Sequence, residues 1–493
     1  MNKHDIKELL KYGDRLFLER KKSTNEISKS VWETYSAFAN TSGGIILLGI
    51  EENLNEPNPE HRFHINGISN PEKRLKEFWD TINSNKVSSN ILMDRHVSCI
   101  EVDGVTIMCI EVPQADYHKK PIYINDNPLK GTYKRNHEGD YHCSEDEIKA
   151  MIRDSSDDGN DGRLLEGFTM EDIDQATLKA YRTLFEHNNP NHVWSQLDDQ
   201  MFLRNIGGYT IDRIQKKEGL SAAGLLMFGN GLAIREAFEH INMDYLDLQN
   251  ANNEQRWSDR ITYDGTWENN LFNFSNKIIS KLSTDLKKPF QLKGYTRIDD
   301  TNVHKAVRES VINMLIHADY QRSGILKVVK YDHGFLLSNP GSLKLPISTI
   351  YEGGNSISRN PRIQKMFRLI GLGDNIGSGF PTILDVWIKQ NWRTPDLYDN
   401  QEIHQVELRL WMMPHLNDSI ELSLYQLFKE EYQSLSKDEQ IILATVYLEN
   451  KITQKRLETI LFKDSFTIGK LLSQLVKKKC LSPNSMEKLI SMY

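Results

Sequence analysis

RESVINMLIHADY, residues 308–320, is the stretch around which the rest of the chain is arranged. Within it Glu309, Asn313 and His317 recur every fourth residue, which places them on one stripe of a helix. Aliphatic residues lie between them and predict a face that packs behind this stripe. A carboxylate and an amide one turn apart can share a Mg²⁺ ion and a water, as triphosphate chemistry requires. The alternative is that the three residues only line a solvated helix face.

The segments that follow this helix continue the pattern. Two β-rich runs, 326–329 and 335–337, are joined by a turn at 332–334. A glycine-rich loop that opens a helix offers unpaired N–H groups to phosphate oxygens, and glycine lets the backbone come close. Three polar or glycine-bearing motifs come next, in the order Ser338-Asn339-Pro340-Gly341, Ser358-Arg359-Asn360-Pro361 and Gly371-Leu-Gly-Asp-Asn-Ile-Gly-Ser-Gly379.

This order of motifs resembles the divergent GHKL-type ATP-binding domain of many bacterial proteins, a relative of the gyrase, histidine-kinase and MutL ATP sites. The resemblance implies that ATP is the ligand, that Glu309 polarises water and that Asn313 holds Mg²⁺. The adenine-reading Asp-x-Gly-x-Gly motif is absent in its strict form and Asn339 stands in its place, so weaker binding or another nucleotide is an alternative. The other residues assigned to the nucleotide are His317, Asn339, Gly341, Ser358, Arg359, Asn360, Gly377 and Gly379.

Length and composition bound the class of protein. A chain of 493 residues predicts about three domains, and 39% hydrophobic with 26% charged residues is typical of a globular α+β multidomain protein. The net charge of −7 gives no global basic signature, so a nucleic-acid contact would need a local patch. Four scattered cysteines predict no zinc site and suit a reducing compartment. No apolar run or leader pattern is present, which predicts a cytoplasmic protein without a membrane partner.

Changes in pattern divide the chain into five parts. We expect a head at 1–153, an acidic linker at 154–165 with nothing to bury, a connecting α/β region at 166–290, the ATP-binding core at 291–417 and a helical module at 418–493. No catalytic constellation stands out in the connecting region. Its predicted elements are helices at 170–186, 200–206 and 269–282, a strand at 241–248, and a segment at 220–229 that runs from a helix start into a strand.

The head shows a compact alternation of strands and helices. Its pattern predicts a strand at 16–21, a helix at 28–40, a buried strand at 45–50, a hairpin at 97–112 and a strand at 120–124.

Glu19-Arg20-Lys21, the run AFANTSGG at 37–44 and GIEE at 49–52 resemble the Schlafen/Alba-type nucleic-acid-binding domain. The later segments 131–136 and 144–148 resemble its closing strand and helix.

In catalytic members of that family, carboxylates hold divalent metal and cut RNA. This implies catalytic and metal-binding roles for Asp14, Glu19 and Glu51, with Lys21 beside them and Mg²⁺ or Mn²⁺ as the ion. Asp14 and Glu51 each depart from the residue more usual at their place. A surface ion pair between Glu19 and Lys21, or binding without cleavage, is the alternative.

Two basic groups are candidates for contact with nucleic acid. Lys134 and Arg135 could follow a phosphate backbone along the head. Helical patterns at 438–448, 453–461 and 465–479 resemble a winged helix-turn-helix, with Thr453 and Ser465 as expected N-caps. The third helix would present Lys470 and Lys477, although such units also serve as dimerisation modules.

The first functional hypothesis is an ATP-regulated protein that acts on nucleic acid, whose head cleaves RNA, with tRNA as a candidate substrate and antiviral defence as a setting. A homo-oligomer is expected by resemblance. The second hypothesis is an ATP-binding transcription regulator that binds DNA without cutting it, and the third is an ATPase scaffold that holds a partner protein. The P-loop motif of motor helicases is absent from the sequence.

Overall fold

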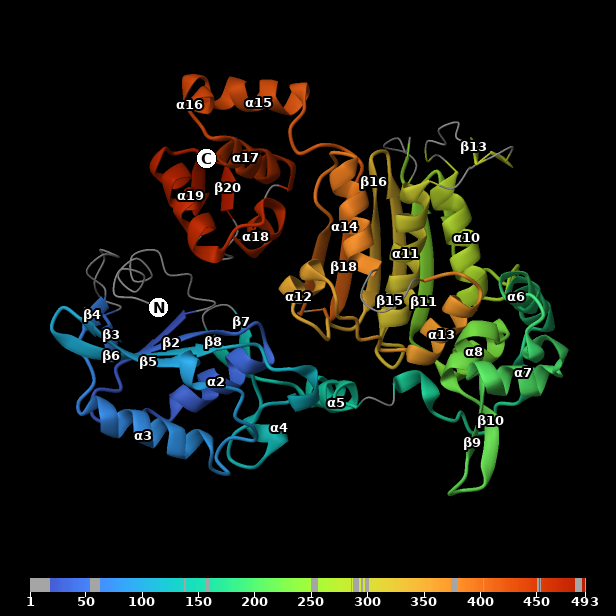
Figure 1. Cartoon of the computed structure of the whole chain (residues 1–493), viewed down its shortest axis with the longest axis horizontal. Helices are drawn as coiled ribbons and strands as arrows, with labels where there is room; N and C mark the ends of the chain where they lie inside the picture. Colours follow the sequence, from blue (N-terminus) through green and yellow to red (C-terminus); the bar gives the residue numbers. More distant parts are fainter. Residues whose placement is uncertain are drawn as a thin grey trace. The chain divides into compact units, whose positions relative to one another are not determined.

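The structure is a computed structural model of the chain (Figure 1). The chain forms two compact units, described here one at a time: Met1–Asp157 with Leu435–Gln454 and Lys463–Tyr493, and Asp158–Ser434 with Lys455–Phe462. The structure describes all residues except 1–17, 54–62, 137–138, 157–158, 250–255, 285, 287–291, 294–295, 298–300, 374–378, 402, 450–451, 453, 484–489 and 493.

The first unit contains the head, which begins with a parallel strand pair. β1 (Leu18–Lys21) lies beside β2 (Gly44–Leu48), and the crossover between them is α2 (Ser30–Asn40). Tyr35 and Phe38 of α2 are fully buried, as their helical spacing predicts.

An antiparallel hairpin completes this sheet. β5 (Val97–Val102) and β6 (Val105–Val112) turn at Asp103-Gly104, and β6 pairs with β2, which gives the order β1-β2-β6-β5. The predicted hairpin is therefore confirmed. The predicted strand at 120–124 is wrong, because this segment makes only isolated bridges in the part of the chain that the structure describes.

The predicted strand after α2 breaks at Gly49. Gly49 has φ +95° and lies against the backbone of Gly67, where a side chain would collide. The chain bends there, and the next residues form β3 (Ile50–Glu52), which pairs with β4 (Phe63–Ile65). Glu51 therefore lies on a strand separate from the main sheet of the head.

The remaining elements of the head surround this sheet. A hairpin of β7 and β8 packs against α2, and α3 packs against β6. Their bounds, with that of the helix that ends the head, are α3 (Pro71–Ile82), β7 (Tyr133–Asn136), β8 (Gly139–His142) and α5 (Glu145–Asp154).

A six-stranded mixed sheet organises the second unit, in the order β12-β11-β15-β16-β18-β17 (Figure 1). β11 and β15 run parallel, and every other neighbouring pair is antiparallel. Helices α10 (Leu271–Ser283), α11 (Asn302–His317) and α14 (Gly379–Lys389) cover one face. The strands are β11 (Ile241–Asp247), β12 (Asp259–Ile261), β15 (Gly324–Tyr331), β16 (Gly334–Pro340), β17 (Asp396–Asn400) and β18 (Gln405–Trp411).

The structure does not divide at the predicted boundary near residue 290. β11, β12 and α10 come before it in sequence, yet they share one sheet or one core with the elements that follow. Phe274 and Leu315, from the two sides of the boundary, belong to the same hydrophobic core. A parallel pair needs a long crossover, and here α10 and α11 provide it between β11 and β15.

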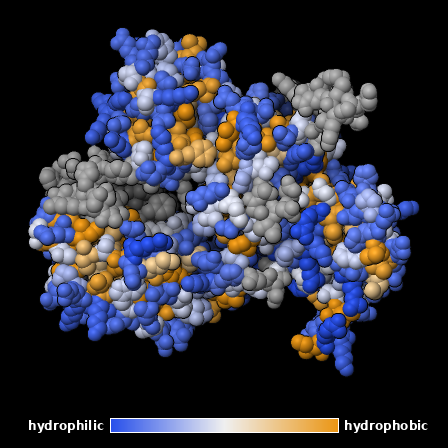
Figure 2. Space-filling model, in the orientation of Figure 1, coloured by the Kyte–Doolittle hydropathy of each residue, from blue (hydrophilic) through white to orange (hydrophobic). Residues whose placement is uncertain are grey.

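The connecting region adds helices and a projecting hairpin to this core. The segment at 220–229 is a helix rather than the start of a strand, because Ser221 caps α8 and the whole short helix is buried, which hides its period. Ile214 at the tip of the β9–β10 hairpin is 94% exposed, and Figure 2 shows an apolar patch there. These elements are α6 (Gln175–Asn188), α7 (Asp199–Ile206), β9 (Tyr209–Asp212), β10 (Lys217–Leu220), α8 (Ala222–Phe228) and α9 (Gly231–Ala237).

The predicted linker buries one of its acids, contrary to expectation. Asp161 is 1% exposed, and its Oδ2 accepts a hydrogen bond from the Ile363 N–H at 2.8 Å, in the first turn of α13 (Pro361–Leu369). A carboxylate in that position complements the unpaired N–H groups and the dipole of the helix. The chain therefore docks onto the second unit a few residues after the head ends.

The C-terminal segment contains the three predicted helices. Asp464 rather than Ser465 is the N-cap of the third, since its carboxylate accepts from the Thr467 N–H at 2.9 Å, and Thr453 lies outside the described residues. No described helix is long and apolar enough to cross a membrane. The elements are α15 (Asp418–Phe428), α16 (Glu430–Gln433), α17 (Lys437–Glu449), α18 (Gln454–Leu461), α19 (Ser465–Lys477), β19 (Leu481–Pro483) and β20 (Ile490–Met492).

Candidate functional site

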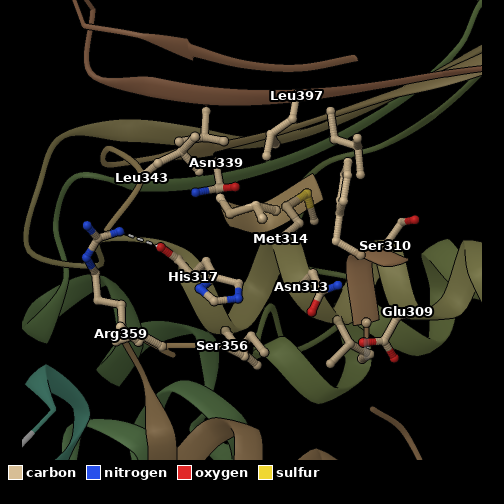
Figure 3. Close-up of a pocket in the computed structure, with 18 of the residues that line it drawn as sticks. Glu309, Ser310, Asn313, Met314, His317, Asn339, Leu343, Ser356, Arg359 and Leu397 are labelled. Atoms are coloured by element: carbon tan, nitrogen blue, oxygen red, sulfur yellow. Dashed lines mark hydrogen bonds between the residues drawn. The ribbon is translucent and has the colours of Figure 1, made fainter. Parts of the chain in front are cut away.

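A pocket in the second unit lies between α11 and the sheet (Figure 3). Glu309, Asn313 and His317 all line it, as their spacing of four predicts. Val311 and Leu315, on other faces of the same helix, are fully buried in the core. The helix is therefore amphipathic in the predicted sense, with its polar stripe directed into a cavity rather than into open solvent.

The sheet gives the pocket an apolar wall with one polar group. Leu337, Leu397, Val406 and Leu408 line this side, and Asn339 of β16 lies among them. The Asn339 Nδ2 atom donates a long hydrogen bond of 3.2 Å to its neighbour's carbonyl oxygen. A flat apolar slot with one amide suits a planar heterocycle whose edge both donates and accepts.

Gly379 adjoins the polar stripe of α11. It is the first residue of α14, and a Cβ atom built on it would overlap the Glu309 carboxylate and lie 3.1 Å from the Asn313 Nδ2. Any side chain at this position would displace the Glu309 carboxylate, whereas glycine leaves the carboxylate and the amide in place. Gly377, also assigned to the phosphate loop, lies outside the described residues.

The Ser358–Asn360 segment forms hydrogen bonds with the C-terminal end of α11. The Asn360 Nδ2 donates to the carbonyl oxygens of Ile316 and Ala318 at 3.1 and 2.7 Å, and the Ser358 Oγ donates to Ile316 at 3.3 Å. These bonds satisfy carbonyls that a helix end leaves unpaired. Ser358 and Asn360 are not among the described lining residues, so they position the site from behind.

Arg359 both lines the pocket and holds its wall together. It is 3% exposed and donates to the His317 carbonyl at 2.6 Å (Figure 3) and to the Ser342 carbonyl at 2.9 Å. Gly341, with φ +115°, makes room for the guanidinium, since a Cβ atom there would lie 2.7 Å from its Nη1. Gly341 therefore acts through Arg359 and is absent from the described lining.

His317 is a neutral side chain in this site. Burial, aided by the nearby charges of Arg359 and Lys344, lowers the pKa of His317 to about 4. At neutral pH the imidazole can donate or accept a hydrogen bond, but it does not supply positive charge to a phosphate.

The rim of the pocket is fixed by a residue that is distant in sequence. Phe380 lines the pocket and packs against Tyr351 of α12 (Ile347–Glu352), with the two rings tilted and their centroids 4.7 Å apart. The Tyr351 hydroxyl donates to the Pro395 carbonyl at 2.6 Å. Arg456 of α18 donates to the same carbonyl at 3.1 Å and to that of Thr394 at 3.0 Å, and it is 7% exposed.

Sequence reasoning missed two basic side chains that line the pocket, Lys344 and Arg368. Arg368 lies in the last turn of α13, three residues before the glycine run at Gly371. A basic residue just ahead of a predicted phosphate loop is the signal that could have identified it.

The acids of the head have a different environment. The Glu19 carboxylate is paired with the Arg135 Nη2 at 2.7 Å and with the Lys21 Nζ at 2.9 Å. Arg135 also reaches Asp140 at 2.8 Å, and its side chain is 2% exposed. Asp14 lies outside the described residues.

Glu51 of β3 is paired with residues that directly follow β1 and β4. It accepts from the Lys22 Nζ at 2.9 Å and the Asn66 Nδ2 at 2.8 Å, contacts that lower the pKa of its carboxyl group. Among the described residues no group of three acids, histidines or cysteines could hold a metal ion. The predicted metal site of Asp14, Glu19 and Glu51 is therefore not assembled by the part of the head that the structure describes.

The predicted nucleic-acid contacts differ in their exposure. Arg135 is buried against Glu19 and Asp140, so its predicted place on a phosphate-binding surface is wrong. Lys134 is paired with Glu147 at 2.7 Å. Lys470 and Lys477 of α19 are exposed, which is compatible with contact to nucleic acid but does not test it.

Comparisons with known proteins divide the chain in a similar way. Residues 14–144 match the Schlafen AlbA_2 family, and residues 149–244 match a domain of unknown function. Residues 327–408 match the HATPase_c_4 family, described as "Putative ATP-dependent DNA helicase recG C-terminal". The Schlafen/Alba resemblance and the resemblance to an ATP-binding domain are confirmed, whereas the winged-helix resemblance stays a prediction.

Two solved structures are similar to the chain. A protein from Corynebacterium diphtheriae is 18% identical, with 97% of this chain and 92% of that one covered and a TM-score of 0.39. The N-terminal domain of a RecG-related protein from Nitrosomonas europaea is 25% identical, with 29% and 94% covered and a TM-score of 0.23. A comparison with curated proteins finds no match.

Proposed function

We propose that this protein binds a nucleoside triphosphate, most simply ATP, with Mg²⁺ in the α11 pocket and acts on nucleic acid through its head. The observation that carries the proposal is the convergence of Glu309, Asn313 and Gly379 at a pocket with an apolar wall. The HATPase match supports ATP as the ligand, and the AlbA_2 match supports nucleic acid as the partner.

The lining residues fit the parts of a nucleotide. Asn313 would hold the Mg²⁺ ion, Glu309 would orient a water, and the helix start at Gly379 would face phosphate oxygens. The metal, when bound, neutralises phosphate charge. Asn339 would meet the edge of the base against the apolar wall. The segment at 355–357, which also lines the pocket, would become ordered over the ligand.

Calorimetric titration of the whole protein with ATP and Mg²⁺ tests this assignment. Asn313→Ala should weaken binding by about 100-fold, because both the metal and the phosphates lose a partner. Glu309→Gln should still bind nucleotide and lose hydrolysis. Lys389→Ala, which removes an exposed ion pair on α14, serves as the control. Equal affinities for the wild type and Asn313→Ala would remove this residue from the site.

For the head, we propose binding of nucleic acid first and cleavage only as its finer part. The finer proposal is metal-dependent cleavage of RNA, with tRNA as a candidate and antiviral defence as the setting. Because Glu19 and Glu51 are each held by cations of the chain, the described residues do not fit a metal ion and we derive no cleavage step. The buried Arg135–Glu19 pair instead favours a DNA-binding regulator without nuclease activity as the second candidate.

One incubation separates these two candidates. Total tRNA, single-stranded DNA and duplex DNA are each mixed with the protein, with and without Mn²⁺, Mg²⁺ and ATP. Discrete fragments that disappear with Glu19→Gln would establish a nuclease, with Asp14 as its third acid. Intact nucleic acid that shifts on a gel would establish binding alone. ATP-dependent association of two copies, the proposed homo-oligomer, is measured by sedimentation of the same samples.

A further inference from the structure

We propose that Arg368 binds the terminal phosphate, so that the pocket distinguishes a nucleoside triphosphate from a diphosphate. The inference rests on the proposed function and deepens it. Arg368 comes from α13, an element to which sequence reasoning assigned no ligand, and it lines the pocket together with Glu309, Asn313 and Gly379.

The positively charged side chains of the pocket are divided between its two ends. Lys344 and Arg359 act on His317, at the C-terminal end of α11, and their charges help to keep that imidazole neutral. Arg359 directs its guanidinium at two backbone carbonyls there. Asn339 and the apolar wall lie at the same end of the pocket. We therefore assign Lys344 and Arg359 to the pocket wall and to the side of the base, and not to the phosphates.

We infer that Arg368 lies at the other end of the pocket. Asn360 precedes α13 directly and holds the C-terminal end of α11, and α13 then packs against that helix. After the last turn of α13, Gly373 lies against Ile312, where a Cβ atom would be 3.4 Å from its side chain. Ile312 precedes Asn313 directly, so the end of α13 lies beside the turn of α11 that carries Asn313, one turn after Glu309.

The basic side chains of α13 differ in what they contact. Arg362 donates to the Gly207 carbonyl at 3.3 Å, and Lys365 donates to the Asn205 carbonyl at 2.9 Å, so both anchor α7. Arg368 is exposed, and its guanidinium makes no hydrogen bond or ion pair with any other described residue. Burial and the charges of Arg368 and Arg362 lower the pKa of Lys365, which shows that these cations crowd one another. An anion beside Arg368 would relieve that repulsion.

A guanidinium suits this role for a geometric reason. Its planar fork matches two phosphate oxygens at once, whereas a neutral imidazole such as His317 offers one hydrogen bond and no charge. With its base at Asn339, a triphosphate would extend further than a diphosphate does, toward the turns of α11 that carry Asn313 and Glu309, beside which α13 ends. The residue is therefore placed to sense the third phosphate, and ADP would leave it in water.

The test compares ATP, ADP and adenosine binding to the full chain with Mg²⁺ by calorimetry. Arg368→Ala should weaken ATP by about 10- to 100-fold, ADP by less than about threefold, and adenosine not at all. Arg368→Lys, which keeps the charge and loses the fork, should fall between. Lys365→Ala on the same helix is the matched control and should leave the ratio of ATP to ADP affinity unchanged.

The outcomes separate this inference from the function on which it rests. If the wild type binds ATP and Asn313→Ala weakens binding, while Arg368→Ala leaves the affinities for both ATP and ADP unchanged, the nucleotide site stands and the role of Arg368 is overturned. If ATP and ADP weaken equally in Arg368→Ala, the residue supports the pocket rather than the third phosphate, which also overturns the inference. A wild type that binds no nucleotide would overturn both proposals.

Discussion

The head and the nucleotide pocket each place carboxylates where a metal ion is expected, but they differ in what surrounds those carboxylates. In the head, Glu19 lies against Arg135 and Lys21, and Glu51 lies against Lys22. In the pocket, Glu309 and an amide neighbour line a cavity in which a glycine has removed the nearest side chain. The head pairs its acids with cations of the chain, whereas the pocket combines a carboxylate with an amide and a glycine at the edge of a cavity.

The function of an acidic motif therefore has to be inferred together with the residues that surround it. A carboxylate paired with a buried arginine is satisfied within the chain, and a metal ion would have to compete with that pair. A carboxylate that lies against a glycine at a helix start borders a cavity in which a ligand can reach it. The motif gives the residue types in both cases, but only the neighbours show whether a ligand is needed. Four measurements test this contrast between the head and the pocket, in order of decreasing effect.

The first is Arg135→Ala, which would leave Glu19 and Asp140 without their buried cation. We expect the free energy of unfolding of the head to fall by about 3–5 kcal/mol, the usual cost of breaking a buried pair. Hydrogen exchange of β1 and β7 in the full chain measures it. Lys22→Ala removes an exposed pair that water screens, so the loss should be far smaller. Similar losses in the two variants would erase the contrast.

The second is Gly379→Ala, which would fill the space beside Glu309. We expect Mg·ATP affinity to fall by about 100-fold, because the added methyl group overlaps the Glu309 carboxylate and displaces it from its place in the pocket. Thermal unfolding of the variant checks that the fold persists. Unchanged affinity would mean that this space is not used by phosphate.

The third concerns Asp161, a buried acid only partly offset by a cation. Burial raises its pKa from 3.8 to about 6, so the folded protein takes up a proton between these values and gains stability as the pH falls through them. Asp161→Asn should therefore stabilise the second unit by about 2 kcal/mol at pH 7 and by nearly nothing at pH 4. Urea unfolding of both proteins across this range measures the difference, and a constant difference would contradict the assignment.

The smallest effect is expected at His317. Because its pKa is lowered to about 4, the folded protein keeps it neutral from pH 8 to pH 6, and its stability penalty develops only as the pH falls from 6.5 toward 4. The ratio of ATP affinities of the wild type and His317→Asn should change less than about twofold between pH 8 and pH 6. A larger change would mean that His317 titrates near neutrality and carries charge to the ligand.

Local pattern predicted the elements well where period and capping agree. The spacing of Glu309, Asn313 and His317 placed them correctly in one pocket, and the turn at Asp103-Gly104 placed a hairpin. It failed where long-range contacts decide. The sequence does not show that β11 pairs with β15 across the predicted boundary, nor that Asn360 donates a hydrogen bond to the end of α11.

The apolar wall and Arg368 show a further limit. Leu397 and Val406 come from strands whose alternation predicts one buried face, but nothing local shows that this face borders a cavity. Arg368 follows the same rule, because which side of α13 meets α11 is a property of packing. Residue type can thus be predicted from the sequence where chemistry is local, and its neighbours only from the fold.

The hydrogen bonds that Arg456 donates to the Thr394 and Pro395 carbonyls determine where a shorter fragment of the chain can end. A fragment that ends at residue 417 would include every described residue of the pocket lining, yet it would lose α18. Two backbone carbonyls and the Asp396 carboxylate would lose the guanidinium that covers them, next to the strand that carries Leu397. A soluble nucleotide-binding fragment therefore has to run through residue 462, although its sheet ends fifty residues earlier.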